Sequence, residues 1–310
     1  MNLAFISHDH CRGHQMGKFH PECPERFHAI NDRMIASGID MLITHYDAPE
    51  VTIDQLARVH DRDYIQKIFD TAPKDPDGLT WIDGDTALNY GTLPAALRSA
   101  GSAIMAVDLV MCDKHHAVFC CVRPPGHHAG RANASGFCFF NNVAIGAAYA
   151  MDHYGLQRIA IVDFDVHHGD GTEEIFTGDP RVLFCSSFQH PFFPGTGADT
   201  DEPNIINLPL PRLTDGAAFR TAVERHWLPR LDEFAPELIF VSAGFDGHAE
   251  DDMAHFNLRE ADFGWITREL HNLAFKHSHE RIVSILEGGY EMSSLGRSVV
   301  THIDELIGHG

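Results

Sequence analysis

The residues best suited to chemistry are concentrated at 163–171, where the sequence reads DFDVHHGDG. The apolar stretch 158–166 predicts a strand, and side chains alternate along a strand with a period of two. Asp163, Asp165 and His167 are therefore expected to point to the same side. Carboxylates and an imidazole buried together are unfavourable unless a cation lies between them. The segment thus predicts ligands for zinc or a similar divalent metal, with helix caps and loop hydrogen bonds as the alternative.

Such a metal needs a third protein ligand from another part of the chain. Asp246 comes shortly after the apolar stretch 237–243, which predicts a neighbouring buried strand. In an open parallel sheet, ligands bind at the carboxyl ends of the strands. Asp246 is therefore the best candidate for the third ligand.

Two adjacent histidines, His127 and His128, follow another apolar stretch and are expected at the same edge of the sheet. Histidine is the usual acid or base at neutral pH, so either one could act on a metal-activated water. Each needs a carboxylate to fix its tautomer, and Asp163 and Asp170 are available. Two hydrogen-bonded loop histidines without a catalytic role are the alternative.

Tyr290 follows Gly288 and Gly289, just beyond the apolar stretch 281–286. Glycines permit unusual backbone angles and close approach of the chain. A tyrosine on such a loop can direct its hydroxyl at a developing oxyanion. Packing in the core is the alternative role for this side chain.

The elements that must position these residues are short apolar stretches that alternate with longer helical patterns. The predicted strands are 2–7, 116–122, 158–166, 181–187, 237–243 and 281–286. The predicted helices are 24–37, 53–71, 93–113, 141–154, 215–234, 259–277 and 293–307, with long loops at 73–84 and 188–217. Nearly all-apolar strands alternating with helices indicate an α/β fold with a parallel sheet buried on both faces. Without a linker or repeat, residues 1–310 are predicted to form a single domain.

Composition narrows the class of protein. The 310 residues include 23 Lys and Arg against 44 Asp and Glu, a net charge of −21, which disfavours nucleic acid as a partner. A basic substrate fits this charge, although solubility alone also explains it. No apolar run reaches the length of a membrane span, and the N-terminus lacks the features of a signal peptide. Seven cysteines without a C-x-x-C pair predict free thiols in a reducing cytoplasm.

Taken together, these segments resemble one known family. The matching segments are HPECPER (20–26), RPPGHHA (123–129), GFCFFNN (136–142), DFDVHHGDGT (163–172), FFPGTG (192–197), SAGFDGH (242–248) and LEGGY (286–290). In this order they resemble the zinc-dependent histone deacetylase family. The LEGGY form is more similar to class II and bacterial deacetylase-like members than to class I.

The resemblance implies the arginase–deacetylase fold, a three-layer αβα arrangement around a mainly parallel eight-stranded sheet. It implies a zinc-dependent amidohydrolase, with ferrous iron as an alternative metal in the cell, that deacylates an acylated amine. The implied zinc ligands are Asp165, His167 and Asp246, and the implied catalytic residues are His127, His128, Asp163, Asp170 and Tyr290.

The resemblance also implies a substrate tunnel and a structural potassium site. The implied tunnel residues are Gly136, Phe137, Phe193 and Met253, and the implied potassium site comprises Asp163, Asp165, His167 and Ser187. Asp85 is matched to an acidic residue at the tunnel rim.

Three positions depart from the family pattern. Asp252 follows Asp251 where a proline is common, and Gln189 replaces a frequent histidine. Met253 stands where a glutamate accompanies acetylpolyamine preference in some relatives. The expected substrate is therefore an acetyl-lysine-like amine, with an acetylpolyamine or a small acylated metabolite as the alternative.

Two rival functions are disfavoured by the residues. A binuclear manganese ureohydrolase on the same fold needs an Asp-x-His-x-Asp pattern, which Val166 and His168 break. A silent acyl-lysine binding module would not need the complete set of catalytic groups. The sequence leaves the oligomeric state open.

Overall fold

The structure is a computed structural model that describes residues 3–308. Its centre is one eight-stranded sheet in which every neighbouring pair of strands is parallel. In spatial order the strands are β2 (Ile43–Asp47), β1 (Leu3–Ser7), β5 (Ala117–Cys120), β10 (Ile282–Leu286), β9 (Leu238–Ala243), β6 (Ile159–Asp163), β7 (Val182–Gln189) and β8 (Ile205–Leu210). All carboxyl ends therefore lie at one edge, as the prediction of the site required.

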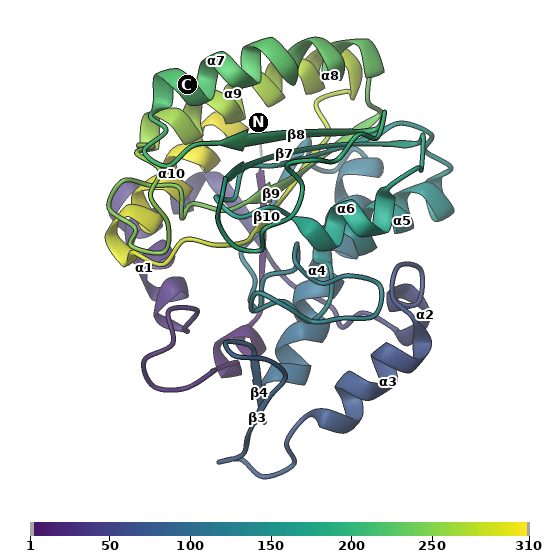
Figure 1. Cartoon of the computed structure of the whole chain (residues 1–310), viewed down its shortest axis with the longest axis vertical. Helices are drawn as coiled ribbons and strands as arrows, with labels where there is room; N and C mark the ends of the chain where they lie inside the picture. The colour runs from purple at the N-terminus through teal and green to yellow at the C-terminus, as the bar shows by residue number, and fades with distance from the viewer. Residues whose placement is uncertain (1–2, 309–310) are drawn as a thin grey trace.

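Helices cover both faces of this sheet (Figure 1). One layer contains α1 (Glu25–Ser37), α7 (Gly216–His226), α8 (Leu228–Phe234), α9 (Glu260–His277) and α10 (Met292–Ile307). The other layer contains α4 (Thr92–Met111), α5 (Asn142–Tyr154) and the short α6 (Asp170–Phe176). The predicted three-layer α/β fold is confirmed, and the sheet proves to be parallel throughout.

The two edge strands were not predicted. β2 is half exposed along its length, and β8 is buried only at Ile205 and Leu208. An edge strand buries less of its surface than a central one, so it lacks the continuous apolar run that marks the inner strands. The predicted loop 188–217 therefore contains β8 and the last residues of β7.

Some predicted helices are divided in the structure. The predicted helix 53–71 consists of α2 (Ile53–Leu56) and α3 (Arg62–Thr71), because Asp61 before α3 is extended. The predicted helix 215–234 breaks between α7 and α8, where Pro229 lies in the first turn of α8 and cannot donate a helix hydrogen bond. The predicted loop 73–84 contains β3 (Leu79–Trp81), which pairs with β4 (Ala87–Asn89) as a separate hairpin. Two short 3₁₀ helices span Asp9–Gly13 and Ile39–Leu42.

Helix α4 is long and apolar enough to cross a membrane by length and composition alone. Its most apolar window is 67% buried inside the fold, where α4 packs on α5 and on strands β1, β5 and β10. The central helix of a folded domain meets the same criterion, so this feature is weak evidence for a membrane span.

Candidate active site

Strand β6 ends at Asp163, three residues before the predicted end of this strand. Asp163 Oδ1 accepts a hydrogen bond from Asp165 N at 3.1 Å, and Asp165 Oδ1 accepts one from His167 N at 2.9 Å. These bonds turn the backbone out of the sheet, because side chains replace the ladder partners. The predicted strand alternation across Asp163, Asp165 and His167 is therefore wrong, although these residues still gather at one edge.

Asp165, His167 and Asp246 form a buried cluster that could hold a metal ion. One ligand atom of each lies within 4.8 Å of the others. His167 Nδ1 is 3.0 Å from Asp165 Oδ1 and 3.2 Å from Asp246 Oδ2. Asp246 Oδ2 is buried and has no partner in hydrogen-bond geometry. Burial and the charge of Asp165 raise the pKa of Asp246 to about 6.

This cluster fits zinc. Two carboxylates and one imidazole are ligand types that zinc accepts, and three protein ligands leave a position open, as at catalytic zinc sites. A cation would neutralise the buried carboxylates and give Asp246 Oδ2 the partner that it lacks. Gly288 allows the close approach, since a Cβ there would lie 2.2 Å from Asp246 Oδ2.

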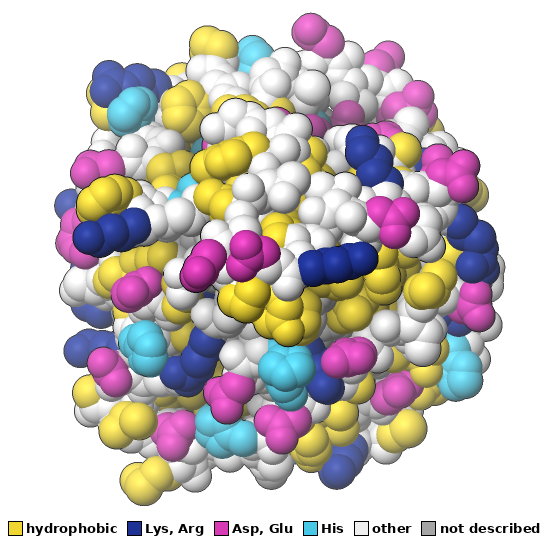
Figure 2. Space-filling model, turned by 90° about the horizontal axis from the view of Figure 1, so that it is seen from below, with side chains coloured by type: hydrophobic (Ala, Val, Ile, Leu, Met, Phe, Trp, Pro, Cys, Tyr) yellow, Lys and Arg dark blue, Asp and Glu magenta, His cyan; other side chains and the backbone are white. Residues whose placement is uncertain are grey.

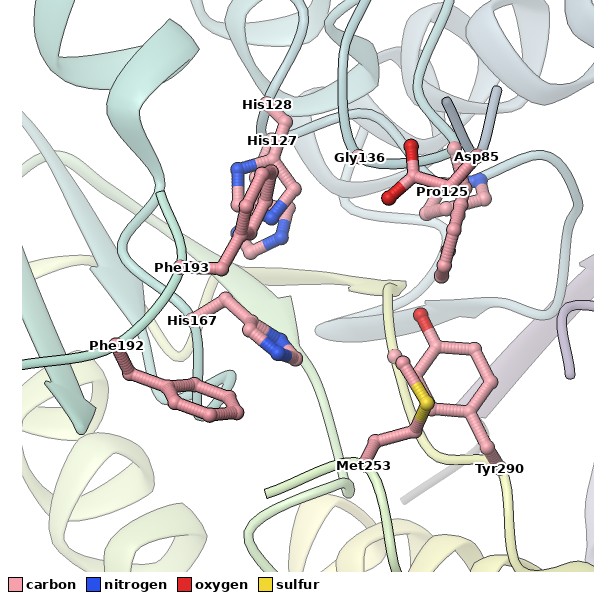
Figure 3. Close-up of a pocket in the computed structure, with 12 residues that line it drawn as sticks. Asp85, Pro125, His127, His128, Gly136, His167, Phe192, Phe193, Met253 and Tyr290 are labelled. Atoms are coloured by element: carbon pink, nitrogen blue, oxygen red, sulfur yellow. The ribbon is translucent and has the colours of Figure 1, made fainter. Parts of the chain in front are cut away.

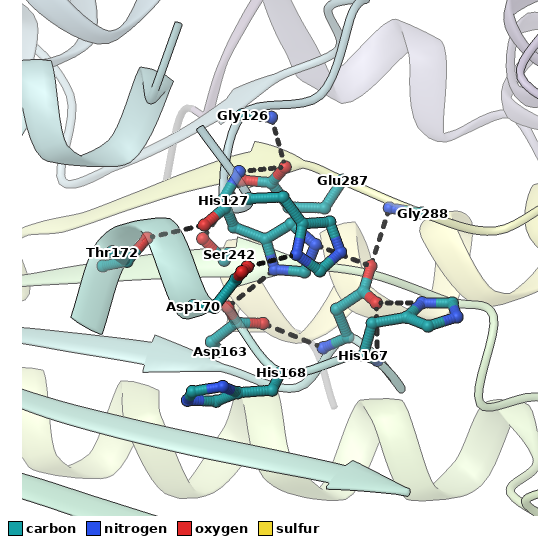
Figure 4. Close-up of polar contacts among 12 residues, drawn as sticks. Gly126, His127, Asp163, His167, His168, Asp170, Thr172, Ser242, Glu287 and Gly288 are labelled. Carbon is teal, nitrogen blue, oxygen red and sulfur yellow. Dashed lines mark hydrogen bonds and ion pairs between the residues drawn. The ribbon is translucent and has the colours of Figure 1, made fainter. Parts of the chain in front are cut away.

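The two histidines are each held by a carboxylate, and Figure 4 shows His127 beside Asp163. His127 Nδ1 lies 2.9 Å from Asp163 Oδ2, and His128 Nδ1 lies 2.6 Å from Asp170 Oδ1. Their rings are 4.0 Å apart between centroids. In both rings the carboxylate occupies Nδ1, and His127 Nε2 lies 3.9 Å from Asp165 Oδ2.

The electrostatic surroundings separate the two histidines. Burial would lower the pKa of His127, but the carboxylates of Asp163 and Asp165 outweigh it and hold that pKa well above its usual range. Burial and the charge of His127 lower the pKa of His128 to about 4. Neighbouring groups whose pKa values are pushed apart in this way are typical of an acid–base pair.

A pocket of about 190 Å³ opens over these groups (Figure 3). It is lined by Asp85, Pro125, His127, His128, Gly136, Phe137, His167, Phe192, Phe193, Met253, Gly288 and Tyr290. The pocket therefore contains all four predicted tunnel residues, both histidines, one metal-cluster residue and the tyrosine. Asp85, matched by sequence to the rim, lines the pocket and is exposed.

Aromatic side chains form much of the pocket wall. Phe193 meets the ring of His128 edge-on at 5.3 Å, and Phe137 meets the ring of Tyr290 edge-on at 5.8 Å. Phe192 stacks on His167 at 5.7 Å and was not predicted to line the site. In the sequence, the only indication that Phe192 lines the pocket is its position next to Phe193 in the segment FFPGTG.

Tyr290 lies on the opposite side of the pocket from Phe193, and its hydroxyl points into the pocket (Figure 3). Its backbone is held by Asp251, whose Oδ2 accepts hydrogen bonds from Tyr290 N at 2.6 Å and Glu291 N at 3.0 Å. Asp251 Oδ1 accepts another from Met253 N at 3.0 Å. One buried carboxylate therefore fixes both the tyrosine loop and a tunnel residue. This role of Asp251 was not predicted from the sequence.

Arg26 also contacts the loop that carries Tyr290. It is fully buried, and its Nε donates to Gly289 O at 2.7 Å. Its guanidinium lies 5.0 Å from the centre of the Tyr290 ring. Only the segment HPECPER pointed to this residue, because the contact joins positions 263 residues apart.

Comparison with known proteins places these observations in a family. Residues 20–306 match the histone deacetylase domain. The chain belongs to the histone deacetylase family, whose members are zinc-dependent amidohydrolases. The resemblance to this family is thus confirmed, and the family implies a divalent metal at the cluster of Asp165, His167 and Asp246.

Individual relatives of this deacetylase-family chain are similar over nearly its whole length. It is 38% identical to type-2 histone deacetylase 2 of Dictyostelium discoideum, over 97% of this chain and 20% of that protein. It is also 38% identical to the polyamine deacetylase HDAC10 of Mus musculus, over 93% of this chain and 45% of that protein. The chain thus spans less than half the length of both relatives. The crystal structure of the HDA15 HD domain matches with a TM-score of 0.92 and 29% identity, covering 99% of this chain and 88% of that one.

Proposed function

We propose that this deacetylase-family chain hydrolyses the amide of an acetyl-lysine-like amine. The observation that carries the proposal is the pocket itself, in which Phe137 and Phe193 line a passage to His127, His128 and Tyr290 above the metal cluster. A passage with apolar aromatic walls suits a straight aliphatic chain that ends in a neutral acyl group.

The chain's own residues supply the proton transfers. Bound zinc would act as a Lewis acid and lower the pKa of a bound water toward about 7. His128, oriented by Asp170, would accept the proton of the water that attacks the acyl carbon. The Tyr290 hydroxyl donates a hydrogen bond to the developing oxyanion. A protonated histidine then delivers its proton to the leaving amine, which gives a free amine and a carboxylate.

Met253 favours an acetyl-lysine-like substrate over an acetylpolyamine, because a thioether offers no charge to a second ammonium group. Two observations keep the acetylpolyamine as the second candidate. One is the net charge of −21, and the other is the similarity to a polyamine deacetylase. An acidic protein of this net charge attracts a polycation such as an acetylpolyamine.

A turnover screen tests the proposal and separates the candidates. Acetyl-lysine peptides, longer-acyl peptides and acetylpolyamines are offered to the zinc-loaded protein. We expect the highest kcat/KM with an acyl-lysine peptide. Met253→Glu should move the preference toward acetylpolyamines, whereas the neutral control Met253→Gln should not. Absence of turnover on every acylated amine would overturn the proposal.

We further propose a potassium site around Asp163, Asp165, His167 and Ser187. Ser187 supports it, because its side chain is buried on β7, the strand beside β6. Ser187→Ala should weaken the increase in melting temperature that potassium gives over sodium. The cytoplasm remains the proposed compartment, supported by seven free cysteines, five of them buried.

A further inference from the structure

A buried carboxylate links the loop that carries His127 to the loop that carries Tyr290. The Glu287 side chain is completely buried. Its Oε2 accepts hydrogen bonds from Gly126 N at 2.7 Å and His127 N at 3.2 Å. Its Oε1 accepts one from Ser242 Oγ at 3.1 Å (Figure 4). The proposed reaction uses none of these contacts directly.

This carboxylate has no ion-pair partner among residues 3–308, although it lies in the protein interior. Burial raises its pKa to about 7, against the opposing charge of His127. A buried acid without a cation destabilises a fold unless its hydrogen bonds compensate. Here the compensating donors are mainly backbone N–H groups of the loop that carries His127.

The strand order explains the reach of this side chain. Glu287 follows β10, which lies between β5 and β9. The histidine loop leaves β5, and Ser242 lies in β9 opposite Asp163 of β6. Hydrogen bonds therefore connect these residues in a network. His127 contacts Asp163 through its ring and Glu287 through its backbone amide. Glu287 in turn accepts a hydrogen bond from Ser242, which lies opposite Asp163 in the sheet.

The backbone of Glu287 is fixed as firmly as its side chain. Its carbonyl oxygen accepts from Arg26 Nη2 at 2.5 Å, and its amide donates to Ala243 O at 3.0 Å. The next amide, Gly288 N, donates to Asp165 Oδ2 at 2.9 Å. Tyr290 is three residues from Glu287 along the same loop. A shift of Glu287 would therefore displace His127 relative to Asp163 and Tyr290 together.

We infer that Glu287 is a positioning residue, which sets the backbone of His127 against Asp163 and the Tyr290 loop. Glu287 does not line the pocket, and none of its hydrogen bonds joins it to Asp165, His167 or Asp246. The inference rests on the proposed function, because it assigns what the Glu287 carboxylate contributes to the same reaction. Support that orients catalytic groups in this way typically changes activity by about 10- to 100-fold.

The test compares Glu287→Gln with Glu287→Ala in the zinc-loaded protein. Glutamine keeps the shape and one acceptor oxygen, whereas alanine removes both acceptors. The control is Asp262→Asn on α9, a buried carboxylate outside the pocket. It accepts a backbone N–H from Arg259 at 2.9 Å and, unlike Glu287, also pairs with Arg220. The measurements are kcat, KM, zinc content, melting temperature and the NMR signal of the His127 Nδ1 proton that faces Asp163.

We expect Glu287→Gln to lower kcat about 10-fold and Glu287→Ala to lower it further, with KM and zinc content nearly unchanged. The His127 proton signal should shift in both Glu287 variants and stay in place in Asp262→Asn. A lower melting temperature with normal kcat and an unmoved signal would overturn the inference. If no substrate is turned over, the proposed function fails, but the NMR signal still decides whether Glu287 positions His127.

Discussion

On the histidine side of the pocket, two carboxylates bind the reactive imidazoles directly, whereas on the tyrosine side the Asp251 carboxylate binds only the backbone of the tyrosine loop. Asp163 and Asp170 each contact an imidazole nitrogen of His127 or His128. Asp251 contacts the amide of Tyr290 and leaves the phenol to face the pocket. The difference follows from the chemistry, because an imidazole that moves protons needs a fixed tautomer and a phenol that only donates does not.

Carboxylates on the two sides of the pocket differ in whether they alter the pKa of a reactive side chain. The carboxylates on the histidine side raise the pKa of His127, so they change its chemistry as well as its place. Asp251 accepts hydrogen bonds from three backbone amides and none from the Tyr290 phenol, so its contacts on the tyrosine side set geometry. Variants on the two sides should accordingly differ in which measured quantity changes.

The largest effect is expected from removing a ligand of the metal cluster, which both sides of the pocket share. Asp165→Ala or His167→Ala deletes a ligand from the buried cluster, so stoichiometric zinc and turnover should both be lost. Metal analysis of the purified variants checks this, with the exposed Asp63→Ala as the control. Full zinc occupancy in either ligand variant would show that the ligand assignment is wrong.

Tyr290→Phe should produce the next largest effect. The change removes one hydroxyl and keeps the ring, so its edge-on contact with Phe137 should persist. Loss of one oxyanion donor typically lowers kcat by about 100- to 1000-fold, or about 3–4 kcal/mol. Steady-state kinetics and zinc content on the same preparation measure it. Normal kcat with a melting temperature lowered instead would mean that Tyr290 has only a packing role.

Asp251→Ala tests the backbone support of the tyrosine side. Because Asp251 holds both Tyr290 and Met253, its loss should lower kcat about 10-fold and also raise KM. Asp251→Asn retains one acceptor oxygen and should have a smaller effect. The remote helix cap Asp215→Asn serves as the control for general destabilisation. A change in melting temperature alone, without any change in kinetics, would contradict the role given to Asp251.

The smallest effect concerns His60, a buried histidine outside the pocket. Its Nδ1 lies 2.8 Å from Gly130 O, and its Nε2 accepts from Asn141 N at 2.9 Å, so it is held neutral. Burial lowers its pKa to about 4, below the 6.5 of the unfolded chain. The unfolded state therefore binds more protons below pH 6.5, and this stabilisation is lost as pH falls toward 4.

Urea unfolding at two pH values measures this contribution. From pH 7 to 5.5 the free energy of unfolding should fall by about 1 kcal/mol more in the wild type than in His60→Asn. The other titrating groups are common to both proteins and cancel in the difference. Equal losses in the two proteins would mean that His60 does not carry this pH dependence.

The sequence by itself determined the family, the central strands and nearly all of the groups gathered in the pocket. Central strands are buried on both faces, so their apolar runs are visible locally, and DFDVHHGDG places two metal ligands within three residues. Only the tertiary structure decided the edge strands, the end of β6 at Asp163 and the support given by Arg26, Asp251 and Glu287. Edge strands lack a continuous apolar run, and the bond from His127 N to Glu287 spans 160 residues. A carboxylate that accepts a backbone N–H from any residue type leaves no sequence pattern, because every non-proline residue offers the same donor.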